Sequence, residues 1–462
     1  MSKPDKFSLV EGGIINKLFL VAFPLIITQI FQMAYNLTDM FWLGRLSSDS
    51  VAASGTVGMF VWLSMAFMFI GRMGAEIGVS QSFGRKDRDS ALVYARNSIQ
   101  IGIVLGVALA VIFILCRRQL IGFFNIREAH VEMYAMDYLE LVSVGFPFAF
   151  TISAISGVFN GSGNSRVSLL INGFGAALNM ILDPIMIFTA DMGIRGAGIA
   201  TIIAQASAAC LAVIVFKRYK GRPFEHIKIF RSPDRQIIKQ IFRWVTPISI
   251  ESFLFTFLTM LIAALIASYG AEAMAAQRVS TQIESMTWLI AGGYASALTA
   301  FTGQNFGAGK WRRIRRGFIV STGMMAGWGA IVGLILYFGC YTLIGVFIPN
   351  DPVVVEIGVG YMQILALIQI PSCLEGVAAG VFRGLGKTVP PSLASVSSNS
   401  LRVVFAYLLT SYTTLGLTGI WIAIAAGAAL RGSWIFIWYV IYSRRNPKAD
   451  TVLENSGDLI KA

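Results

Sequence analysis

The feature that most constrains this chain is a series of long apolar segments that recurs from one end to the other. Twelve such segments can be counted, separated by short polar breaks. A helix of about 20 apolar residues crosses the roughly 30 Å hydrocarbon core of a bilayer. The sequence therefore predicts a multi-pass membrane protein. The predicted spans are 17–42, 52–83, 93–115, 130–160, 167–190, 195–217, 240–268, 274–305, 313–340, 354–383, 390–411 and 418–443.

The composition and the pattern inside each segment favour membrane helices over a soluble fold or a barrel. Of the 462 residues, 56% are hydrophobic and 13% are charged, whereas soluble domains carry about 25% charged residues. The apolar runs are continuous and do not alternate as barrel strands do. We therefore expect an all-α integral membrane protein, in which each helix satisfies its own backbone groups.

The basic residues are distributed unevenly between the two predicted sides of the membrane. Of the 37 lysines and arginines, 27 fall at the termini and on every second connection, and five fall on the opposite connections. Positive loops stay in the cytoplasm, so we expect a multi-pass protein of the cell (plasma or inner) membrane with both termini in the cytoplasm. This bias accounts for the net charge of +13, and we expect no nucleic-acid partner. The run KWRRIRR (310–316) lies between two spans.

The chain contains an internal repeat with one fixed offset, the separation between Pro24 and Pro247, which we call the repeat offset. Because six spans is an even number, the second half enters the membrane in the same orientation as the first. We therefore predict two six-helix bundles related by a pseudo-two-fold axis along the membrane normal. The other pairs at the same offset are QSFG (81–84) and QNFG (304–307), VFNGSGN (158–164) and VFRGLGK (381–387), and Gly193 and Gly416.

This repeat predicts how the chain is divided. Transporters built from two such halves bind substrate between them and expose it alternately to each side. The predicted parts are an N-lobe (1–217), a basic cytoplasmic linker (218–239), a C-lobe (240–443) and a cytoplasmic tail (444–462).

Polar side chains in the first half gather on single faces of three predicted helices, because offsets of three, four and seven residues return to one face. The topology places two acids and two further polar residues at a similar depth, in the outer half of the membrane. These four are Asp39, Asn179, Asp183 and Thr201. The remaining members of the stripes, Gln29, Gln32, Asn36, Asn172 and Gln205, are predicted to line a substrate cavity.

Two acids at one depth in a membrane indicate a site whose charge changes. An isolated charge at the bilayer centre costs about 2.5–3.5 kcal/mol on the gentlest scale, so Asp39 and Asp183 are expected to share protons or a bound cation. Carboxylate, amide and hydroxyl oxygens suit Na⁺ or a proton relay, and no other metal is predicted. The alternative for each acid is a capped, purely structural carboxylate near the headgroups.

The second half has its own embedded charges, also predicted to line the cavity. Arg278 could instead pair with an acid, and Glu375 could be the partner of an embedded arginine such as Arg402. We expect Arg278, Arg402 and Arg431 to point at acids or carbonyls. The second-half cavity residues are Glu251, Gln277, Arg278, Gln282, Glu284 and Glu375.

Several stretches resemble the multidrug and toxic compound extrusion (MATE) transporters. They are YNLTDMFWLG (35–44), LNMILDPIMIF (178–188), GIRGAGIATII (193–203) and YTTLGLTGIWIAI (412–424). The likeness covers nearly the whole chain and is greatest to the DinF-like and archaeal branch. It implies cation-linked function at Asp39, Asn179, Asp183 and Thr201. The NorM-like branch relies on acids in the second half, and Glu251 and Glu375 do not match its pattern cleanly.

The sequence thus predicts a monomeric secondary antiporter without cofactors. It would export amphipathic organic cations in exchange for protons or sodium ions. Membrane lipids are its other expected partners. With no Walker-type loop, two histidines and no nucleophile motif, neither ATP drive nor an enzyme is expected. Two alternatives stay open: a lipid-linked precursor flippase of the wider superfamily, which the three embedded arginines would suit, and a non-transporting membrane sensor or anchor.

Overall fold

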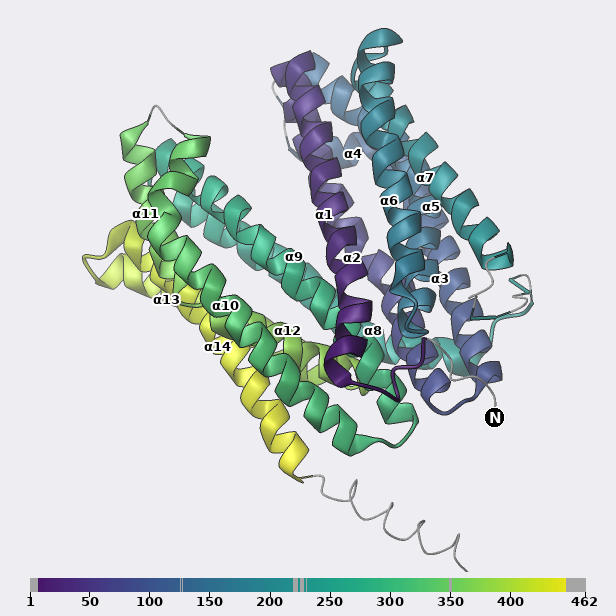
Figure 1. The fold of residues 1–462 in the computed structure, drawn as a ribbon. Coiled ribbons are helices and arrows are strands. Elements are labelled where there is room, and N and C mark those ends of the chain that lie inside the picture. Colours follow the sequence, from purple (N-terminus) through teal and green to yellow (C-terminus); the bar gives the residue numbers. More distant parts are fainter. Residues whose placement is uncertain are drawn as a thin grey trace, which may run out of the picture. The chain divides into compact units, whose positions relative to one another are not determined.

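The computed structural model describes residues 7–124, 126, 128–218, 223–224, 228–229, 231–348 and 351–445, and all the regular structure in these residues is helical (Figure 1). The first half contains α1 (Ile14–Leu46), α2 (Ser48–Gly84), α3 (Arg88–Leu115), α4 (Arg117–Gly122), α5 (Ala129–Gly161), α6 (Ser165–Pro184), the π-helix η1 (Ile185–Thr189) and α7 (Gly193–Arg218). The second half contains α8 (Arg235–Ala267), α9 (Ala271–Gly307), α10 (Trp311–Phe347), α11 (Pro352–Ala366), α12 (Gln369–Gly384), α13 (Val389–Tyr412) and α14 (Gly416–Arg445).

Each predicted span corresponds to one helix or one helix pair. Nine described helices are long and apolar enough to cross a membrane alone, and the bent pair α11–α12 makes a tenth. The other two predicted spans coincide with α9 and α13, whose polar residues lower their hydropathy. The prediction of an all-helical, multi-pass membrane protein is therefore confirmed.

The tenth predicted span, 354–383, is wrong in one respect: it is broken. Helices α11 and α12 meet at an angle of 50° across a short break. Pro371 stands in the first turn of α12, where its missing N–H and its ring prevent the helical hydrogen bond to the carbonyl of Leu367. The side chain of Gln369 donates to the carbonyl of Leu365 (2.9 Å) and so satisfies a group at the end of α11.

The repeat extends to the ends of the helices. Helix α2 begins and ends at positions 48 and 84, and α9 begins and ends at 271 and 307, so both ends are displaced by the same repeat offset. The left-handed turn residues repeat as well, since Gly163 (φ 87°) corresponds to Gly386 (φ 72°). Both halves therefore use the same turns to set where their helices start.

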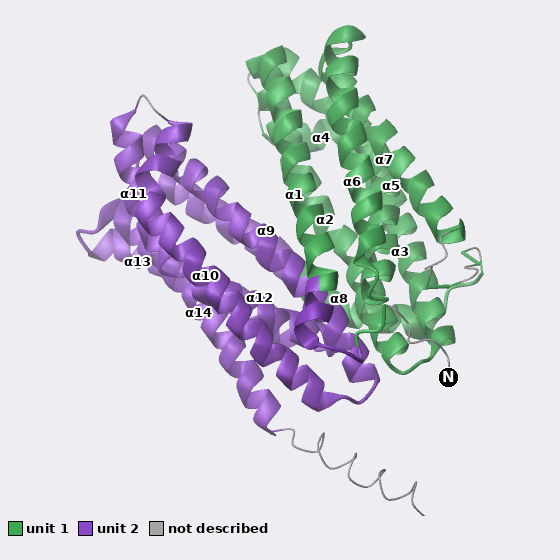
Figure 2. Ribbon diagram, in the orientation of Figure 1, with its two compact units in different colours: residues 1–9, 20–249 green, residues 10–19, 250–462 purple. Residues whose placement is uncertain are grey.

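The chain forms two compact units, coloured separately in Figure 2. Unit 1 holds residues 1–9 and 20–249, and unit 2 holds 10–19 and 250–462. The units divide inside α8, at Ser249, because the first half of this helix packs in unit 1. There Trp244 stacks on Tyr94 with 5.6 Å between ring centroids, and the Ser249 hydroxyl donates to the carbonyl of Ala66 (3.1 Å).

Parts of the predicted linker and tail cannot be compared with the structure. Residues 219–222, 225–227, 230 and 446–462 lie outside the described residues. Of the described linker residues, 231–234 lead directly into α8, and 235–239 already belong to that helix.

Close helix packing in each unit depends on glycines of a repeated GVFxG sequence. In unit 1, α5 packs against α2, α3 and α7, and in unit 2, α12 packs against α9, α10 and α14. A Cβ at Gly157 would lie 2.3 Å from the carbonyl oxygen of Arg72, and one at Gly380 would lie 2.7 Å from that of Ala295. Small residues spaced four apart allow membrane helices to approach this closely.

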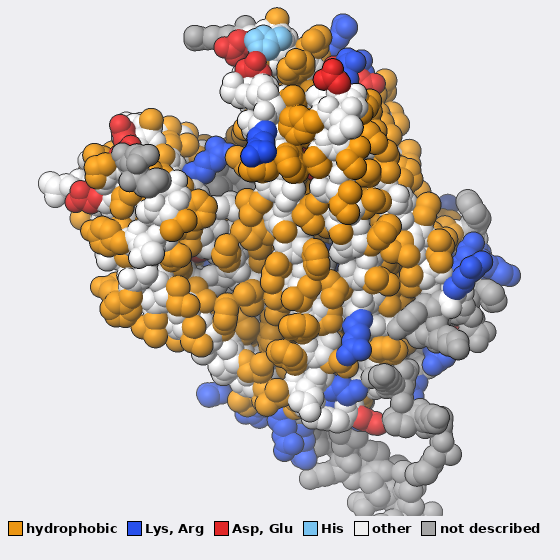
Figure 3. Space-filling model, turned by 45° about the horizontal axis from the view of Figure 1, so that its top comes forward, with side chains coloured by type: hydrophobic (Ala, Val, Ile, Leu, Met, Phe, Trp, Pro, Cys, Tyr) orange, Lys and Arg blue, Asp and Glu red, His pale blue; other side chains and the backbone are white. Residues whose placement is uncertain are grey.

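The outward faces of the helices are apolar, as a lipid environment requires. Large hydrophobic side chains such as Trp62 (66% exposed) and Phe338 (78% exposed) point outward. Figure 3 shows apolar side chains covering the helical faces in view, with lysine and arginine gathered mainly toward their ends. This distribution agrees with helices that span a hydrocarbon layer.

Replacing Gly157 by alanine should destabilise the protein by about 1–3 kcal/mol, because a rigid backbone carbonyl occupies the space of the new methyl group. Gly55, also in unit 1, is the matched control, since nothing lies within 4 Å of a Cβ built on it. Gly55→Ala should be neutral or stabilising by up to about 1 kcal/mol. Melting curves in detergent will measure both, and equal melting temperatures for the two variants would contradict the packing argument.

Candidate ion-coupling site

The four residues predicted to form one site do lie together, inside unit 1. Asn179 and Asp183 are on α6 and Thr201 is on α7, and their exposed fractions are 2%, 0% and 4%. The Asn179 amide donates to the hydroxyl of Thr201 at 3.3 Å and thereby joins the two helices. Asp39, on α1, lies within electrostatic range of Asp183. We refer to Asp39, Asn179, Asp183 and Thr201 as the acid cluster.

Local features of the sequence fix where α6 and α7 present these side chains. The spacing of four residues between Asn179 and Asp183 places both on one face of α6. Pro184 then ends the regular helix, and the chain continues as a π-helical turn. A Cβ at Gly196 would lie 2.5 Å from the carbonyl oxygen of Met186, so only glycine lets α7 approach this turn so closely. Thr201, about one and a half turns further along α7, is thereby brought to α6.

The acid cluster has too few hydrogen-bond donors for its acceptors. The Thr201 hydroxyl donates away from the cluster, to the carbonyl of Ala197 (3.0 Å). Neither carboxylate oxygen of Asp183 receives a well-formed hydrogen bond from the described residues. The same is true of one buried carboxylate oxygen of Asp39 and of the amide oxygen of Asn179. Buried oxygens without donors are costly. A proton or a small cation would satisfy them.

Two tyrosines that sequence reasoning missed complete the surroundings of the acids. Tyr35 on α1 lies close to Thr201, Asp39 and Asp183. Tyr138 on α5, 7% exposed, lies within electrostatic range of both acids and of Tyr35. Tyr35 precedes Asp39 by one helical turn, and that spacing was the available signal. Tyr138 lies between Asp137 and Glu140 on α5, and nothing in that stretch of sequence indicated that it faces the acid cluster.

The other predicted cavity residues of the first half are divided between packing and exposed positions. Asn172 donates to the hydroxyl of Ser156 (2.9 Å) and links α6 to α5. The buried amide oxygen of Gln205 has no hydrogen-bond partner among the described residues, and the side chain lies against Gly145. Gln32 and Asn36 are exposed and Gln29 is half-buried. None of these residues joins the acid cluster.

The second repeat is an internal comparison for the acid cluster. At the repeat offset from Asp39, Asn179, Asp183 and Thr201, the second half has Ile262, Arg402, Ala406 and Ile424. Ile262 (2% exposed) and Ala406 (0%) belong to a hydrophobic cluster of unit 2, with Ile424 packed against it. The same fold thus builds this region from apolar residues, so the acids of unit 1 are not required by the architecture.

The three predicted cavity acids of unit 2, in contrast, already have partners. Glu251 accepts a hydrogen bond from the Ser392 hydroxyl at 2.8 Å. Glu375 forms an ion pair with Arg431 at 2.7 Å, with exposed side-chain fractions of 17% and 7%. Glu284 receives a longer contact of 3.5 Å from the amide of Gln369. These carboxylates therefore have less need of a bound ion than those of the acid cluster.

The predictions for the embedded arginines are confirmed in one case and wrong in two. Arg431 points at an acid, as predicted. The alternative given for Glu375, an embedded arginine as its partner, is confirmed, although that arginine is Arg431 and not Arg402. Arg402 donates instead to the hydroxyl of Thr259 (3.1 Å), because the equivalent of the acid cluster around it is apolar. Arg278 is exposed and has no ion pair or hydrogen bond within the described part of the chain.

The other polar residues predicted on α9 lie mostly at its surface. Gln282 is exposed and Gln277 is half-buried, whereas Glu284 is 8% exposed. Of the predicted polar cluster on this helix, Glu284 is the member that is brought into the interior of unit 2.

Fold and site together define a two-repeat, multi-pass membrane protein with embedded acids of the kind that transporters carry. The family model described as MatE matches residues 24–185 and 247–408. The two matches are themselves separated by the repeat offset and together cover more than half of the chain. The chain therefore belongs to the MatE family and is a multi-pass protein of the cell membrane.

Similar proteins agree with this assignment over nearly the full length. The probable multidrug resistance protein NorM of Thermotoga maritima is 29% identical over 436 residues, covering 92% of each chain. The probable multidrug resistance protein YpnP of Bacillus subtilis is 25% identical over 438 residues, covering 94% of this chain and 96% of its own. The resemblance to MATE transporters is confirmed, and the DinF-like branch stays a prediction.

Solved structures share the fold. An outward-facing multidrug resistance MATE family transporter superposes with a TM-score of 0.91 at 20% identity, covering 96% of this chain and 99% of its own. A transporter of the MOP superfamily from Pyrococcus furiosus gives a TM-score of 0.90 at 20% identity, with the same coverage. At this identity the likeness shows the fold alone.

The buried pair Glu375–Arg431 gives a stability prediction. Arg431→Gln should cost about 3–5 kcal/mol, because it leaves Glu375 without its counter-charge. The double variant Glu375→Gln/Arg431→Gln should recover much of that loss. Arg117, whose pair with Glu140 is 36% and 41% exposed, is the control, and Arg117→Gln should cost less than about 1 kcal/mol. Denaturant or thermal unfolding measures all three, and a double variant as unstable as Arg431→Gln would count against the ion pair.

Proposed function

We propose that this protein is a secondary active antiporter that exports amphipathic organic cations, including drugs, in exchange for protons or sodium ions. The observation that carries the proposal is the pair of donor-poor acids in unit 1, the buried Asp183 and the half-buried Asp39, at positions where unit 2 has apolar residues of one cluster. A costly feature that the fold does not require is best explained by a function. The multidrug relatives support the substrate class.

The acid cluster would couple ion and substrate through its occupancy. When it is empty, two carboxylates repel each other across α1 and α6. A proton or Na⁺ removes that repulsion and supplies the oxygens with the positive charge they lack. Helices α1, α6 and α7 can then pack more tightly. If the loaded and empty arrangements favour opposite-facing states, or if ion and substrate compete, one gradient drives the other.

The wider assignment follows from the same proposal. Its partners are small organic cations and membrane lipids, and it works as a monomer. It uses no cofactor and catalyses no reaction. Both termini lie in the cytoplasm. In support, the Lys310 side chain, on a basic connection, donates to the carbonyl of Val10 near the N-terminus (3.2 Å), so these two segments share a side.

The lipid-linked precursor flippase is less well supported. It would need several guanidinium groups free to hold phosphates. Arg431 is committed to Glu375, and Arg402 is held by Thr259 and lies 5.8 Å from the ring centroid of Phe255.

Asp39→Asn should abolish ion-driven transport while leaving folding intact. The substitution keeps size and hydrogen bonding but removes the titratable charge, and it relieves a charge that is costly in the membrane. The measurement is efflux of an organic cation from proteoliposomes under an imposed proton gradient, and then under a sodium gradient. Transport by Asp39→Asn and by Asp183→Asn should fall at least about tenfold, and the double variant should be little worse, because the acids act as one unit.

The fold control uses the residues of the second repeat. The double variant Asp39→Ile/Asp183→Ala should melt at or above the wild-type temperature and still fail to transport. A monodisperse Asp39→Asn protein with the wild-type efflux rate would refute the assignment. Efflux by the wild type that depends on neither gradient would refute the antiporter itself.

The partnered acids of unit 2 should behave differently. We expect Glu251→Gln and Glu375→Gln to change apparent substrate affinity several-fold while gradient-driven efflux persists, since Ser392 and Arg431 already satisfy these carboxylates. Initial rates over a range of substrate concentrations separate the two effects. The reverse pattern, in which either glutamine variant uncouples transport and Asp39→Asn does not, would move the coupling site to unit 2.

A further inference from the structure

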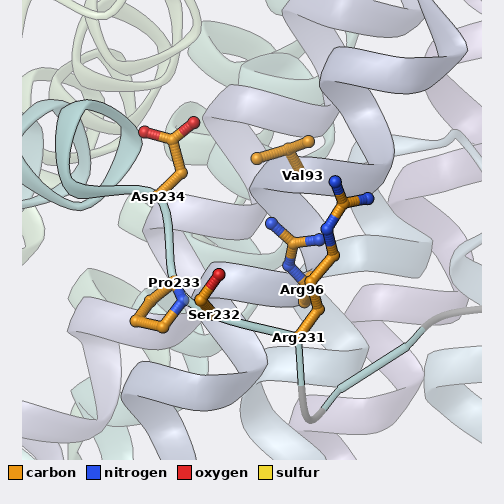
Figure 4. Close-up of a pocket in the computed structure, with 6 residues that line it drawn as sticks. All are labelled: Val93, Arg96, Arg231, Ser232, Pro233 and Asp234. Atoms are coloured by element: carbon orange, nitrogen blue, oxygen red, sulfur yellow. The ribbon is translucent and has the colours of Figure 1, made fainter.

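A cavity in unit 1, away from the acid cluster, has the features of an anion site. Its volume is about 310 Å³, and it is lined by Val93 and Arg96 of α3 and by residues 231–234, which precede α8. Figure 4 shows Arg96 and Arg231 reaching into this region, with the Asp234 carboxylate directed elsewhere. The volume is at the small end of the range of ligand pockets, which begins at about 300 Å³.

The segment that carries Arg231 is fastened to α3 by two amide side chains. Gln100 donates to the carbonyl oxygens of Ile229 (2.5 Å) and Arg231 (2.8 Å). The side-chain oxygen of Asn97 accepts from the backbone N–H of Asp234 (3.1 Å). These contacts hold the segment against the helix on either side of the cavity, so the cavity is a built part of the fold.

Arg96 is a buried cation without a counter-charge. The residue is 7% exposed, and its buried Nε has no hydrogen-bond partner among the described residues. Asp234, the acid of the lining, is used elsewhere, because its Oδ1 accepts from the backbone N–H groups of Gln236 and Ile237 and caps α8. Arg96 forms no ion pair within the described residues. A buried, unpaired guanidinium is costly, so a ligand that neutralises it would bind favourably.

The arrangement is not part of the repeated scaffold. The positions that correspond to Arg96, Asn97 and Gln100 at the repeat offset are Ile319, Val320 and Gly323, and Ile319 is 61% exposed. Helix α10 therefore packs without any of these polar groups. As with the acid cluster, the polar residues of α3 are additions to an architecture that does not need them.

We propose that this cavity binds a phosphate group, held by the guanidinium groups of Arg96 and Arg231. Guanidinium groups bind phosphate oxygens with paired, charge-assisted hydrogen bonds. The cavity lies at the N-terminal end of α3, on the side to which we assign the cytoplasm, where basic pockets meet the headgroups of anionic lipids. The phosphate belongs either to such a lipid or to a soluble phosphate of the cell.

The test uses the purified full-length protein in a non-ionic detergent, and three probes. Phosphatidylglycerol, phosphatidylcholine and inorganic phosphate are titrated while bound lipid is counted by native mass spectrometry and the melting temperature is followed. The variants are Arg96→Gln and Arg231→Gln. The matched control is Arg243→Gln, because Arg243 is exposed on α8 and does not line the cavity.

The wild type should bind phosphatidylglycerol in preference to phosphatidylcholine if the ligand is a lipid, or respond to inorganic phosphate if it is soluble. Arg96→Gln and Arg231→Gln should each weaken that binding at least about tenfold, the size expected for a lost charge-assisted hydrogen bond. Arg231 is exposed, so its variant keeps the test decisive if Arg96→Gln fails to fold. The proposal would be overturned if the wild type bound neither phosphatidylglycerol nor inorganic phosphate, if the variants bound as the wild type does, or if Arg243→Gln lost as much binding.

Discussion

The structure depends on one constraint: inside a bilayer, no water is available to satisfy a polar group. The helices satisfy their own backbone groups, and an embedded side chain can be satisfied by a neighbour, as Glu375 is by Arg431. The acid cluster does not meet the constraint, because neither oxygen of Asp183 receives a well-formed hydrogen bond from the described residues. A proton or cation that binds reversibly would satisfy these oxygens, and an antiporter couples such binding and release to substrate transport.

The internal repeat separates what the fold needs from what the function adds. Both halves share helix ends, left-handed turns and the GVFxG packing of α5 and α12. At the positions of Asp39 and Asp183, however, the second half has Ile262 and Ala406 in an apolar cluster. Ion coupling in unit 1, and phosphate binding near Arg96, would thus be functions that one copy carries and the other lacks.

Much of this could be predicted from the sequence because membrane spans and repeats leave strong signals. The pattern of apolar segments located the twelve spans, apart from the break in the tenth. Helical periodicity and the predicted topology together placed Asp39, Asn179, Asp183 and Thr201 at a similar depth. Side-chain partners could not be predicted in the same way. The choice of Arg431 over Arg402 as the partner of Glu375 depends on which face each helix turns inward. The break between α11 and α12, and the place of Tyr138 beside the acids, depend likewise on packing in three dimensions.

The most direct test of the central claim is a binding measurement, because linkage requires ion and substrate to affect each other's affinity equally. Affinity of the purified protein for a fluorescent organic cation should be measured across pH, with and without sodium. The account predicts that the coupling ion weakens substrate binding in the wild type, and that Asp39→Asn binds substrate with an affinity independent of that ion. Equal ion dependence in both proteins would contradict the claim that the acid cluster couples ion to substrate.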